Sequence, residues 1–576
     1  MTEAPRRHKN KLLARIGLAL SLLCGAAVLC GTVPVDVSHT NSATAAGPTI
    51  SIDAGAAGTP VDVSHFVGTN AASWYSDHLV NGTLLNRTRA AGHGLLRILG
   101  GAWSQEYGWL SCEMGQDVAG AYPCKDFTHA RPSDFITFLQ ATGRAAMYTV
   151  NINTTAQEAA ALVAFFNADV SDPTPIGNDV RGTDWKTAGH WAQLRASHGH
   201  SDPIGIKLWD FGNETYGGVL TNGQKDCHAA DDPQQPGWEE TWTCDGTQYV
   251  NGIGGGANRH EGYLEFRAAM RAVDPEILLG VVGYSDPAAY SNWGNEVIAA
   301  GGDQIDFYTV HVYPYYFFPP NSAAGYAEIL ALPQTLWPGI RSANQAAFDA
   351  NAGGRNIPIW VTEYNLGNPD QDNDQLITRM IAGLFIADSI GQMMTQGFDS
   401  AMQWDLLGWD QASGTNLGLL NQNAAYRRSP QYYALPLWSR FGARLLSTTS
   451  SLDAAQQLSV YGGRAGDTTY TLLAINKTDQ PIVATLHIAD AAGTLTIQGG
   501  SADVVQAETL AAQNVTYNNV GDPSDDLANA PSLPLASAGE APSYTFSPRS
   551  ITLLRLQVDR PSALGCCQLL LPLIHR

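Results

Sequence analysis

Between residues 63 and 446 the chain alternates short apolar runs with longer segments of helical periodicity. The runs predict strands at 63–70, 95–101, 145–153, 205–214, 277–283, 307–314, 357–365 and 400–408. Helical patterns between them include 132–142, 156–168, 260–273 and 375–394, and a helix at 430–446 is expected to close the region. Strands that alternate with helices favour an α/β fold, a (β/α)8 TIM barrel. An open doubly wound sheet would need a glycine-rich phosphate turn after its first strand, and this sequence has none there.

After residue 446 the pattern changes to alternating or β-branched runs separated by Gly, Asp and Pro. The expected strands predict a C-terminal β-sandwich and lie at 458–461, 468–476, 482–489, 494–497 and 543–556. Residues 516–541 are predicted to form a long surface loop. The expected organisation is an N-terminal strand that joins the sandwich, the barrel, the sandwich and a tail of unknown role, at 47–62, 63–446, 447–558 and 559–576.

Residues 1–46 have the pattern of an export signal. Arg and Lys residues precede an apolar core at 16–29, and Ala43-Thr44-Ala45 matches the small-x-small cleavage pattern. We therefore expect a secreted protein that is cleaved near Ala45 or Ala46. The long gap between the apolar core and Ala45 leaves an uncleaved membrane anchor as the alternative.

The formal net charge of −21 and the pI of about 4.9 limit the partners. An acidic surface argues against nucleic acid and anionic membranes. After residue 46 no stretch is apolar enough to span a bilayer, so no integral membrane partner is expected. No motif indicates a metal, nucleotide or redox cofactor, and the oligomeric state is left open.

Four cysteines lie in the main body of the chain: Cys112, Cys124, Cys227 and Cys244. Their spacing does not match a zinc site, and export favours disulfides. Proximity favours the pairs Cys112–Cys124 and Cys227–Cys244, each closing one long loop, after the second and the fourth expected barrel strand. The other two pairings stay open.

Two apolar runs are each followed by a glutamate at the expected end of a strand. Residues 206–217 leave the expected fourth strand at Asn213 and Glu214, and residues 357–365 carry Glu363 at the end of the seventh. The carboxyl ends of barrel strands meet at one mouth of the barrel, where active sites lie. Two carboxylates about 5–5.5 Å apart perform retaining hydrolysis of glycosidic bonds. We therefore predict Glu214 and Glu363 as a catalytic pair.

Glu363 is the predicted nucleophile and Glu214 the predicted acid/base, whose pKa we expect to be raised beside an ionised Glu363. Asn213 is expected to bond the 2-OH of the sugar. An Asn-Glu pair after an apolar run also suits a helix N-terminus, with Asn as the cap. Glu363, at the end of a matching strand, favours the catalytic interpretation.

Several segments resemble the α-L-arabinofuranosidases, which belong to the large clan of retaining glycosidases with (β/α)8 barrels. RILGGAWSQEYGW resembles the Arg-x-x-Gly-Gly segment of their second strand, and VNINTTAQEAAALVAFFNA their Asn-bearing third strand and the helix that follows it. HWAQLRASHGHSDPIGIKLWDFGNETYG resembles the approach to their acid/base glutamate, HVYP their sixth strand and WVTEYN their nucleophile strand.

The resemblance implies that Arg97 and Tyr313 hold Glu363 charged and oriented. His311 is expected to contact the substrate, with a satisfied buried histidine as the alternative. Trp404, on the eighth expected strand, is a candidate for stacking on sugar, with the barrel core as the alternative. Asp210 is expected to make a structural bond.

The leading hypothesis is a secreted, retaining, α-L-arabinofuranosidase-like hydrolase that acts on plant polysaccharide or oligosaccharide by double displacement. A β-xylosidase, endoglucanase or glucuronidase of the same clan would keep the mechanism and change the substrate. A non-catalytic carbohydrate-binding protein is the alternative from another class. The loops at 102–131 and 217–258 are expected to shape the cleft and so to decide the sugar.

Overall fold

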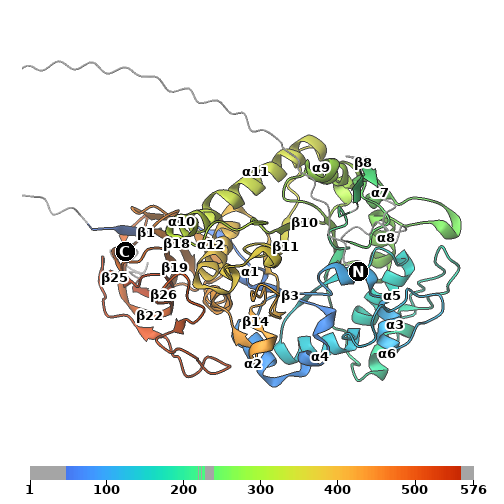
Figure 1. Cartoon of the computed structure of the whole chain (residues 1–576), viewed down its shortest axis with the longest axis horizontal. Coiled ribbons are helices and arrows are strands. Elements are labelled where there is room, and N and C mark those ends of the chain that lie inside the picture. The colour runs from blue at the N-terminus through green and yellow to red at the C-terminus, as the bar shows by residue number, and fades with distance from the viewer. Residues whose placement is uncertain (1–46, 218, 222–223, 227–238, 560–576) are drawn as a thin grey trace, which may run out of the picture. The chain divides into compact units, whose positions relative to one another are not determined.

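Parallel strands form a closed barrel, and β3, β10 and β11 of this barrel are labelled in Figure 1. The computed structural model describes residues 47–217, 219–221, 224–226 and 239–559. Around the barrel the strands follow the order β10-β11-β12-β3-β4-β5-β6-β9. Their bounds are β3 Gly68–Ala71, β4 Leu96–Ile98, β5 Ala146–Val150, β6 Leu208–Phe211, β9 Leu278–Val282, β10 Phe307–Val312, β11 Ile359–Tyr364 and β12 Ser400–Gln403. The expected (β/α)8 barrel is confirmed.

Apolar residues fill the barrel from one end, and polar residues follow further along the same strands. Leu95, Met147, Phe307, Trp360 and Met402 form a buried cluster of their own. Since side chains alternate along a strand, residues two positions further on share the same face. That face carries the polar side chains of the site at the carboxyl ends of the strands. The barrel interior is therefore a packed floor beneath a polar layer.

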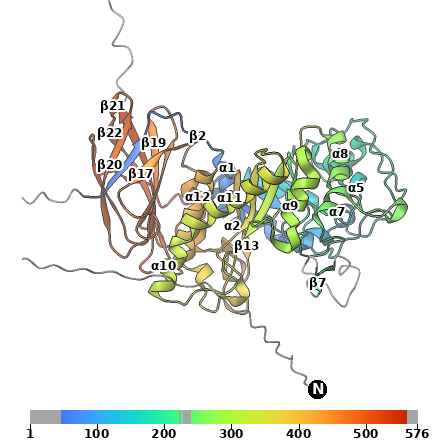
Figure 2. The ribbon, with the colours of Figure 1, turned by 90° about the horizontal axis from the view of Figure 1, so that it is seen from above.

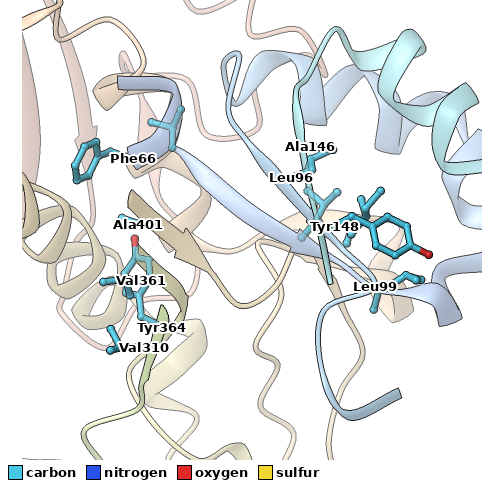
Figure 3. Close-up of a cluster of buried hydrophobic side chains, with 14 of the residues drawn as sticks. Phe66, Leu96, Leu99, Ala146, Tyr148, Val310, Val361, Tyr364 and Ala401 are labelled. Atoms are coloured by element: carbon cyan, nitrogen blue, oxygen red, sulfur yellow. The ribbon is translucent and has the colours of Figure 1, made fainter. Parts of the chain in front are cut away.

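The outer side chains of the strands pack against the surrounding helices. Together they form a second, larger buried cluster, part of which Figure 3 shows. It includes Leu96 of β4, Tyr148 of β5, Val310 of β10, Val361 of β11 and Ala401 of β12. A strand buried on both faces needs a nearly continuous apolar run, which is the pattern that predicted these strands. Burial of such side chains contributes roughly 1.5–3 kcal/mol each.

Helices lie between consecutive strands and cover the barrel (Figure 1). They are α1 Val63–Phe66, α2 Gly82–Ala90, α3 Trp109–Met114, α4 Pro132–Thr142, α5 Ala156–Asn167, α6 Ala188–Ser197, α7 Gly246–Asn251, α8 Tyr263–Val273, α9 Ala289–Gly301, α10 Ala323–Ala331, α11 Pro333–Asn351, α12 Met380–Gln396 and α13 Ala434–Trp438. Short 3₁₀ helices include η6 Leu376–Thr378 and η8 Pro430–Tyr433. Small strands outside the barrel are β7 Val219–Thr221, β8 Gln224–Asp226, β13 Leu407–Gly408, β14 Leu420–Asn421 and β15 Arg427–Arg428.

The strand expected at 63–70 and the helix expected at 430–446 are wrong in part. The strand expected at 63–70 begins as helix α1, because the side chain of Asp62 accepts from the backbone N–H of Ser64 and caps a helical turn. The helix expected at 430–446 ends at Trp438. Gly442, with φ at 111°, turns the chain, and Arg444–Leu446 is strand β16 of the sandwich.

The C-terminal β-sandwich consists of two sheets (Figure 2). One sheet has the order β17-β1-β20-β21 with β25 beside β20, and the other has β2-β16-β18-β19-β26-β22-β23 with β24 beside β22. The bounds are β1 Thr49–Asp53, β2 Thr59–Pro60, β16 Arg444–Leu446, β17 Thr448–Ser450, β18 Leu458–Arg464, β19 Thr469–Asn476, β20 Ile482–Asp490, β21 Gly493–Thr494, β22 Thr496–Gln506, β23 Thr516–Tyr517, β24 Leu533–Pro534, β25 Ser543–Phe546 and β26 Ser550–Asp559. The single strand expected at 543–556 is therefore wrong. It is two strands in different sheets, which a turn containing Arg549 at φ 48° separates.

A disulfide joins Cys112 to Cys124, whose Cα atoms are 5.0 Å apart. Cys227, the predicted partner of Cys244, lies outside the described residues, and so do the export signal and residues 560–576 of the tail. Those predictions therefore stay untested. Among the helices that the structure describes, none is long and apolar enough to cross a membrane.

A buried ion pair connects helix α12 with the sandwich. Lys477, directly after β19, donates to Asp388 of α12 at 2.7 Å, and both side chains are 1% exposed. Tyr461 of β18 donates to the same carboxylate at 2.6 Å, and Gln334 of α11 donates at 3.0 Å. Because each charge is fully withdrawn from water, each depends on the other for its solvation.

Replacing Lys477 by Met should destabilise the protein by about 3–5 kcal/mol, because Asp388 would be left as a buried charge without its cation. Chemical denaturation followed by tryptophan fluorescence measures the change. Lys186→Met is the matched control, since Lys186 pairs with Asp184 at 2.6 Å on the surface, where both are about half exposed. A surface pair contributes about 1 kcal/mol or less. Equal losses in the two variants would contradict the buried-pair argument.

Candidate active site

The guanidinium of Arg97, on β4, is the centre of the polar layer. It is fully buried and donates to Asp210 at 3.0 Å, to Glu363 at 2.7 Å, to Asn70 at 3.2 Å and to Asn213 at 2.9 Å. Burial alone would lower the pKa of Arg97, but the two carboxylates outweigh it and raise that pKa. The residue therefore stays charged, and its acceptors come from three other strands or their ends.

Glu363, near the end of β11, is held by donors on both oxygens. Arg97 donates to Oε1, and the hydroxyl of Tyr313 donates to Oε2 at 2.8 Å. Burial and the negative charge of Glu363 raise the pKa of Tyr313 well above its ordinary value, so the phenol keeps its proton. A register shift between Val310 and His311 adds one residue to β11 and places His311 opposite Glu363.

Glu214 lies just after β6, in a turn rather than in the strand. Gly212 at φ 90° and Glu214 itself at φ 42° turn the chain toward the barrel mouth. A non-glycine residue at positive φ is strained, and such residues gather at functional sites. The side chain of Glu214 is 23% exposed and lies 2.9 Å from Nδ1 of His311. The hydroxyl of Tyr216 donates to the same oxygen at 2.9 Å.

The expected raised pKa of Glu214 is wrong for the free protein. Burial alone would raise it, but the hydrogen bonds from His311 and Tyr216 and the charge of Arg97 favour the carboxylate and lower the pKa. The sequence predicted the neighbouring negative charge of Glu363 and missed the donors that surround Glu214.

The two predicted glutamates face each other at the barrel mouth. One oxygen of Glu214, one oxygen of Glu363 and a ring nitrogen of His311 lie within 4.8 Å of one another. In the described part of the chain these three side chains form the group that is suited to a metal ion. Arg97 already supplies a positive charge beside Glu363, which disfavours a second cation there.

Trp404 follows β12 and lies over the two glycines after β4. A Cβ on Gly101 would lie 2.6 Å from the indole of Trp404, and one on Gly100 would lie 3.1 Å from it. Small residues are therefore required where the second strand meets this ring. Trp74 lies edge-on to Trp404 at 6.1 Å, and Trp103 and Trp409 lie 6.3 Å and 6.0 Å from Trp74. Aromatic side chains thus line one side of the mouth.

The predicted catalytic and sugar-binding residues lie together at this mouth: Glu214, Glu363, Asn213, Arg97, His311, Tyr313 and Trp404. Asp210, which was expected to make a structural bond, forms an ion pair with Arg97 at 2.9 Å. The structure adds residues that the sequence analysis missed. Asn70 lies one residue before the end of β3, the first barrel strand, so its position near a strand end was an available signal. Tyr216, Asp405 and Glu239 lie in loops, where no periodicity marks them.

No protein-family model matches the chain. A curated relative named as an intracellular exo-α-(1→5)-L-arabinofuranosidase of Bifidobacterium longum is 23% identical over 307 residues. The match covers 51% of this chain and 45% of the relative, so it spans about half of the relative's length.

Solved structures are similar over most of the chain. An α-L-arabinofuranosidase from Thermotoga maritima, solved as an arabinose complex, has a TM-score of 0.63 at 17% identity and covers 89% of this chain and 100% of that one. A Paenibacillus polymyxa xyloglucanase of glycoside hydrolase family 44 has a TM-score of 0.55 at 14% identity, with 89% and 99% coverage. The fold is therefore that of the α-L-arabinofuranosidases and related clan members, as the sequence motifs predicted.

Asp405 gives the site a testable pH dependence. It is buried, accepts from Tyr75 at 2.8 Å, and burial is the main cause that raises its pKa to about 7 from an ordinary 3.8. The unfolded chain releases this proton near pH 3.8, so stability should fall as the pH rises toward about 7 and then level off. Asp405→Asn removes this loss and keeps an acceptor for Tyr75.

The melting temperature of Asp405→Asn should therefore exceed that of the wild type by a margin that grows from about pH 4 to about pH 7. Thermal melts across pH 4–9 measure the margin. Asp467→Asn, on a fully exposed side chain, is the control. A margin that does not change with pH would show that Asp405 is ionised throughout.

Proposed function

We propose that the chain is a retaining glycoside hydrolase of the α-L-arabinofuranosidase type. One observation carries the proposal: Glu214, in the turn after β6, and Glu363, near the end of β11, point carboxylate oxygens to within 4.8 Å of each other at one barrel mouth. Retaining enzymes hold their two carboxyl groups about 5–5.5 Å apart, whereas inverting enzymes leave about 6.5–9.5 Å for a water molecule.

In the first step Glu363 attacks the anomeric carbon, and the bond from that carbon to the leaving oxygen breaks. Arg97 and Tyr313 donate to its two oxygens, so the nucleophile is held in one orientation. Glu214 gives its proton to the leaving oxygen. Hydrogen bonds lower the pKa of Glu214, so its protonated form is lost at a lower pH than that of an ordinary glutamate. Because the first step needs that proton, we expect an acidic activity optimum.

In the second step water attacks the glycosyl ester of Glu363, and Glu214 accepts the proton of that water. The free protein already holds Glu214 as the carboxylate through His311 and Tyr216. The same contacts orient it. One residue thus serves as acid and then as base, with Glu363 restored at the end.

We infer an L-arabinofuranosyl group as the glycone. The inference is supported by the similarity to arabinofuranosidases, one of them solved with arabinose. The xyloglucanase shares the fold, so a β-xylosidase, endoglucanase or glucuronidase is the alternative. A panel of 4-nitrophenyl glycosides tests the inference, because the one sugar that responds names the glycone. Plant side chains that carry arabinofuranose are the proposed natural substrate class.

We also propose that the protein is secreted, with residues 1–46 as the export signal. The pattern of that segment and the disulfide Cys112–Cys124 support this, since disulfides persist in oxidising compartments. Expression with the native N-terminus should place the protein in the medium, and N-terminal sequencing should begin close to Ala45 or Ala46. Retention in the membrane fraction with an intact N-terminus would favour the anchor.

Glu363→Ala should lower kcat by about four to six powers of ten, because no glycosyl ester can form. Steady-state kinetics with the responding aryl glycoside measures the loss. Added azide should yield at most a glycosyl azide of inverted configuration, since azide would then take the place of the nucleophile. Full activity in this variant would remove Glu363 from the mechanism.

Glu214→Ala should behave differently with an activated aryl glycoside, whose leaving group needs little protonation. The first step survives, the intermediate accumulates, and azide restores turnover as a glycosyl azide of retained configuration. Azide needs no deprotonation, so it substitutes for the missing base. NMR of the product assigns the configuration. An inverted glycosyl azide from Glu214→Ala would mean that Glu214 is the nucleophile and Glu363 the acid/base.

A further inference from the structure

A third carboxyl group, Glu239, lies beside the catalytic pair. Its side chain is 5% exposed, and its Oε1 accepts a hydrogen bond of 3.0 Å from Nδ2 of Asn213. Its Oε2 is buried and has no hydrogen-bond partner among the residues that the structure describes. A buried carboxyl group with an unpaired oxygen is costly, so its retention needs an explanation.

The chain around Glu239 is anchored on the turn after β5. Asn153 donates to the backbone carbonyl of Glu240 at 3.1 Å, and the indole of Trp242 donates to the carbonyl of Ile152 at 3.1 Å. These bonds hold the segment after residue 238 against the barrel. Glu239 therefore has a defined place, although it belongs to a loop.

Asn213 is fixed from three sides. Its Oδ1 accepts from Arg97 at 2.9 Å, its backbone carbonyl accepts from Gln105 at 3.2 Å, and one N–H of Nδ2 is given to Glu239. Arg97 has no acceptor, so the amide can take only one orientation. The second N–H of Nδ2 has no partner among the described contacts, and it is the donor that a sugar hydroxyl can meet.

The charges around the site favour the neutral acid at Glu239. Burial is the main cause that raises the pKa of Glu239 well above its ordinary value, and the negative charges of Glu214 and Glu363 add to it. A neutral carboxyl group keeps a carbonyl oxygen that accepts from Asn213. It also avoids a further negative charge beside the catalytic pair.

We propose that Glu239 is a positioning residue that acts through Asn213: its carbonyl oxygen holds the amide so that the remaining N–H points to the 2-OH of the sugar. The proposal rests on the proposed function, because it takes Asn213 as the residue that meets this hydroxyl. Such a contact strengthens in the transition state of glycoside hydrolysis. Glu239 itself touches neither of the two catalytic carboxylates in any described hydrogen bond.

Two substitutions separate the effect of the side-chain length of Glu239 from the effect of its ability to ionise. Glu239→Gln keeps the carbonyl oxygen at its full reach and removes the ability to ionise, whereas Glu239→Asp keeps the acid and withdraws the oxygen by one methylene. For a positioning residue, kcat/KM of Glu239→Gln stays within about 3-fold of the wild type. Glu239→Asp loses about 10- to 100-fold, as a misplaced group does. Glu240→Gln, on the exposed neighbouring side chain, is the matched control and should match the wild type.

The 2-deoxy form of the responding aryl glycoside gives the readout that a merely structural role would not change. The loss in Glu239→Asp should appear with the 2-hydroxy substrate and shrink to within about 3-fold with the 2-deoxy substrate. Circular dichroism and melting temperature confirm that the variants are folded. Should Glu239→Asp fail to fold, Glu239→Gln decides: wild-type discrimination between the two substrates supports the proposal, and lost discrimination overturns it.

The remaining outcomes are also decisive. Equal losses on both substrates in Glu239→Asp, or a larger loss in Glu239→Gln than in Glu239→Asp, would overturn the positioning role. If the wild type hydrolyses the parent glycoside and the variants give either of these results, only the positioning role of Glu239 is overturned. A wild type without turnover on any glycoside overturns the proposed function, and with it the role of Glu239.

Discussion

The guanidinium of Arg97 sits where no water reaches it and donates to side chains from β3, β6, β11 and the turn after β6. A buried cation requires acceptors, and buried carboxylates require donors, so the members of this cluster stabilise one another. The strands that carry them must meet in one register. The apolar floor of Leu95, Met147 and Trp360 supports this layer from below. The geometry of the mouth follows from that mutual requirement.

The network also assigns different environments to two chemically identical groups. Glu363 receives Arg97 and Tyr313, and Glu214 receives His311 and Tyr216. The first carboxylate is buried and held on both oxygens, and the second is more exposed and held on one. The double displacement that we propose would use the first as the nucleophile and the second as the acid/base. The difference between them arises from Arg97, Tyr313 and His311 on or after other strands and from Tyr216 in the turn that carries Glu214.

How far sequence predicts this molecule depends on whether the determining contacts are local. Helix α4 was predicted with the observed bounds, because Pro132 starts it and Gly143 at φ 67° ends it. Glu214 and Glu363 were predicted because an apolar strand precedes each. The lowered pKa of Glu214 was not predicted, since its donor His311 is 97 residues away in the chain. Glu239 gave no signal either, because loop anchoring by Asn153 and Trp242 places it.

The first strand of the described chain completes the last domain. β1 pairs in parallel with β20 and antiparallel with β17, and Thr49 bonds Ser451 across 402 positions. The barrel likewise closes only when β12 meets β3. On the ribosome, therefore, β1 emerges early and waits for most of the remaining chain before it finds either partner. Such late, long-range closure slows folding.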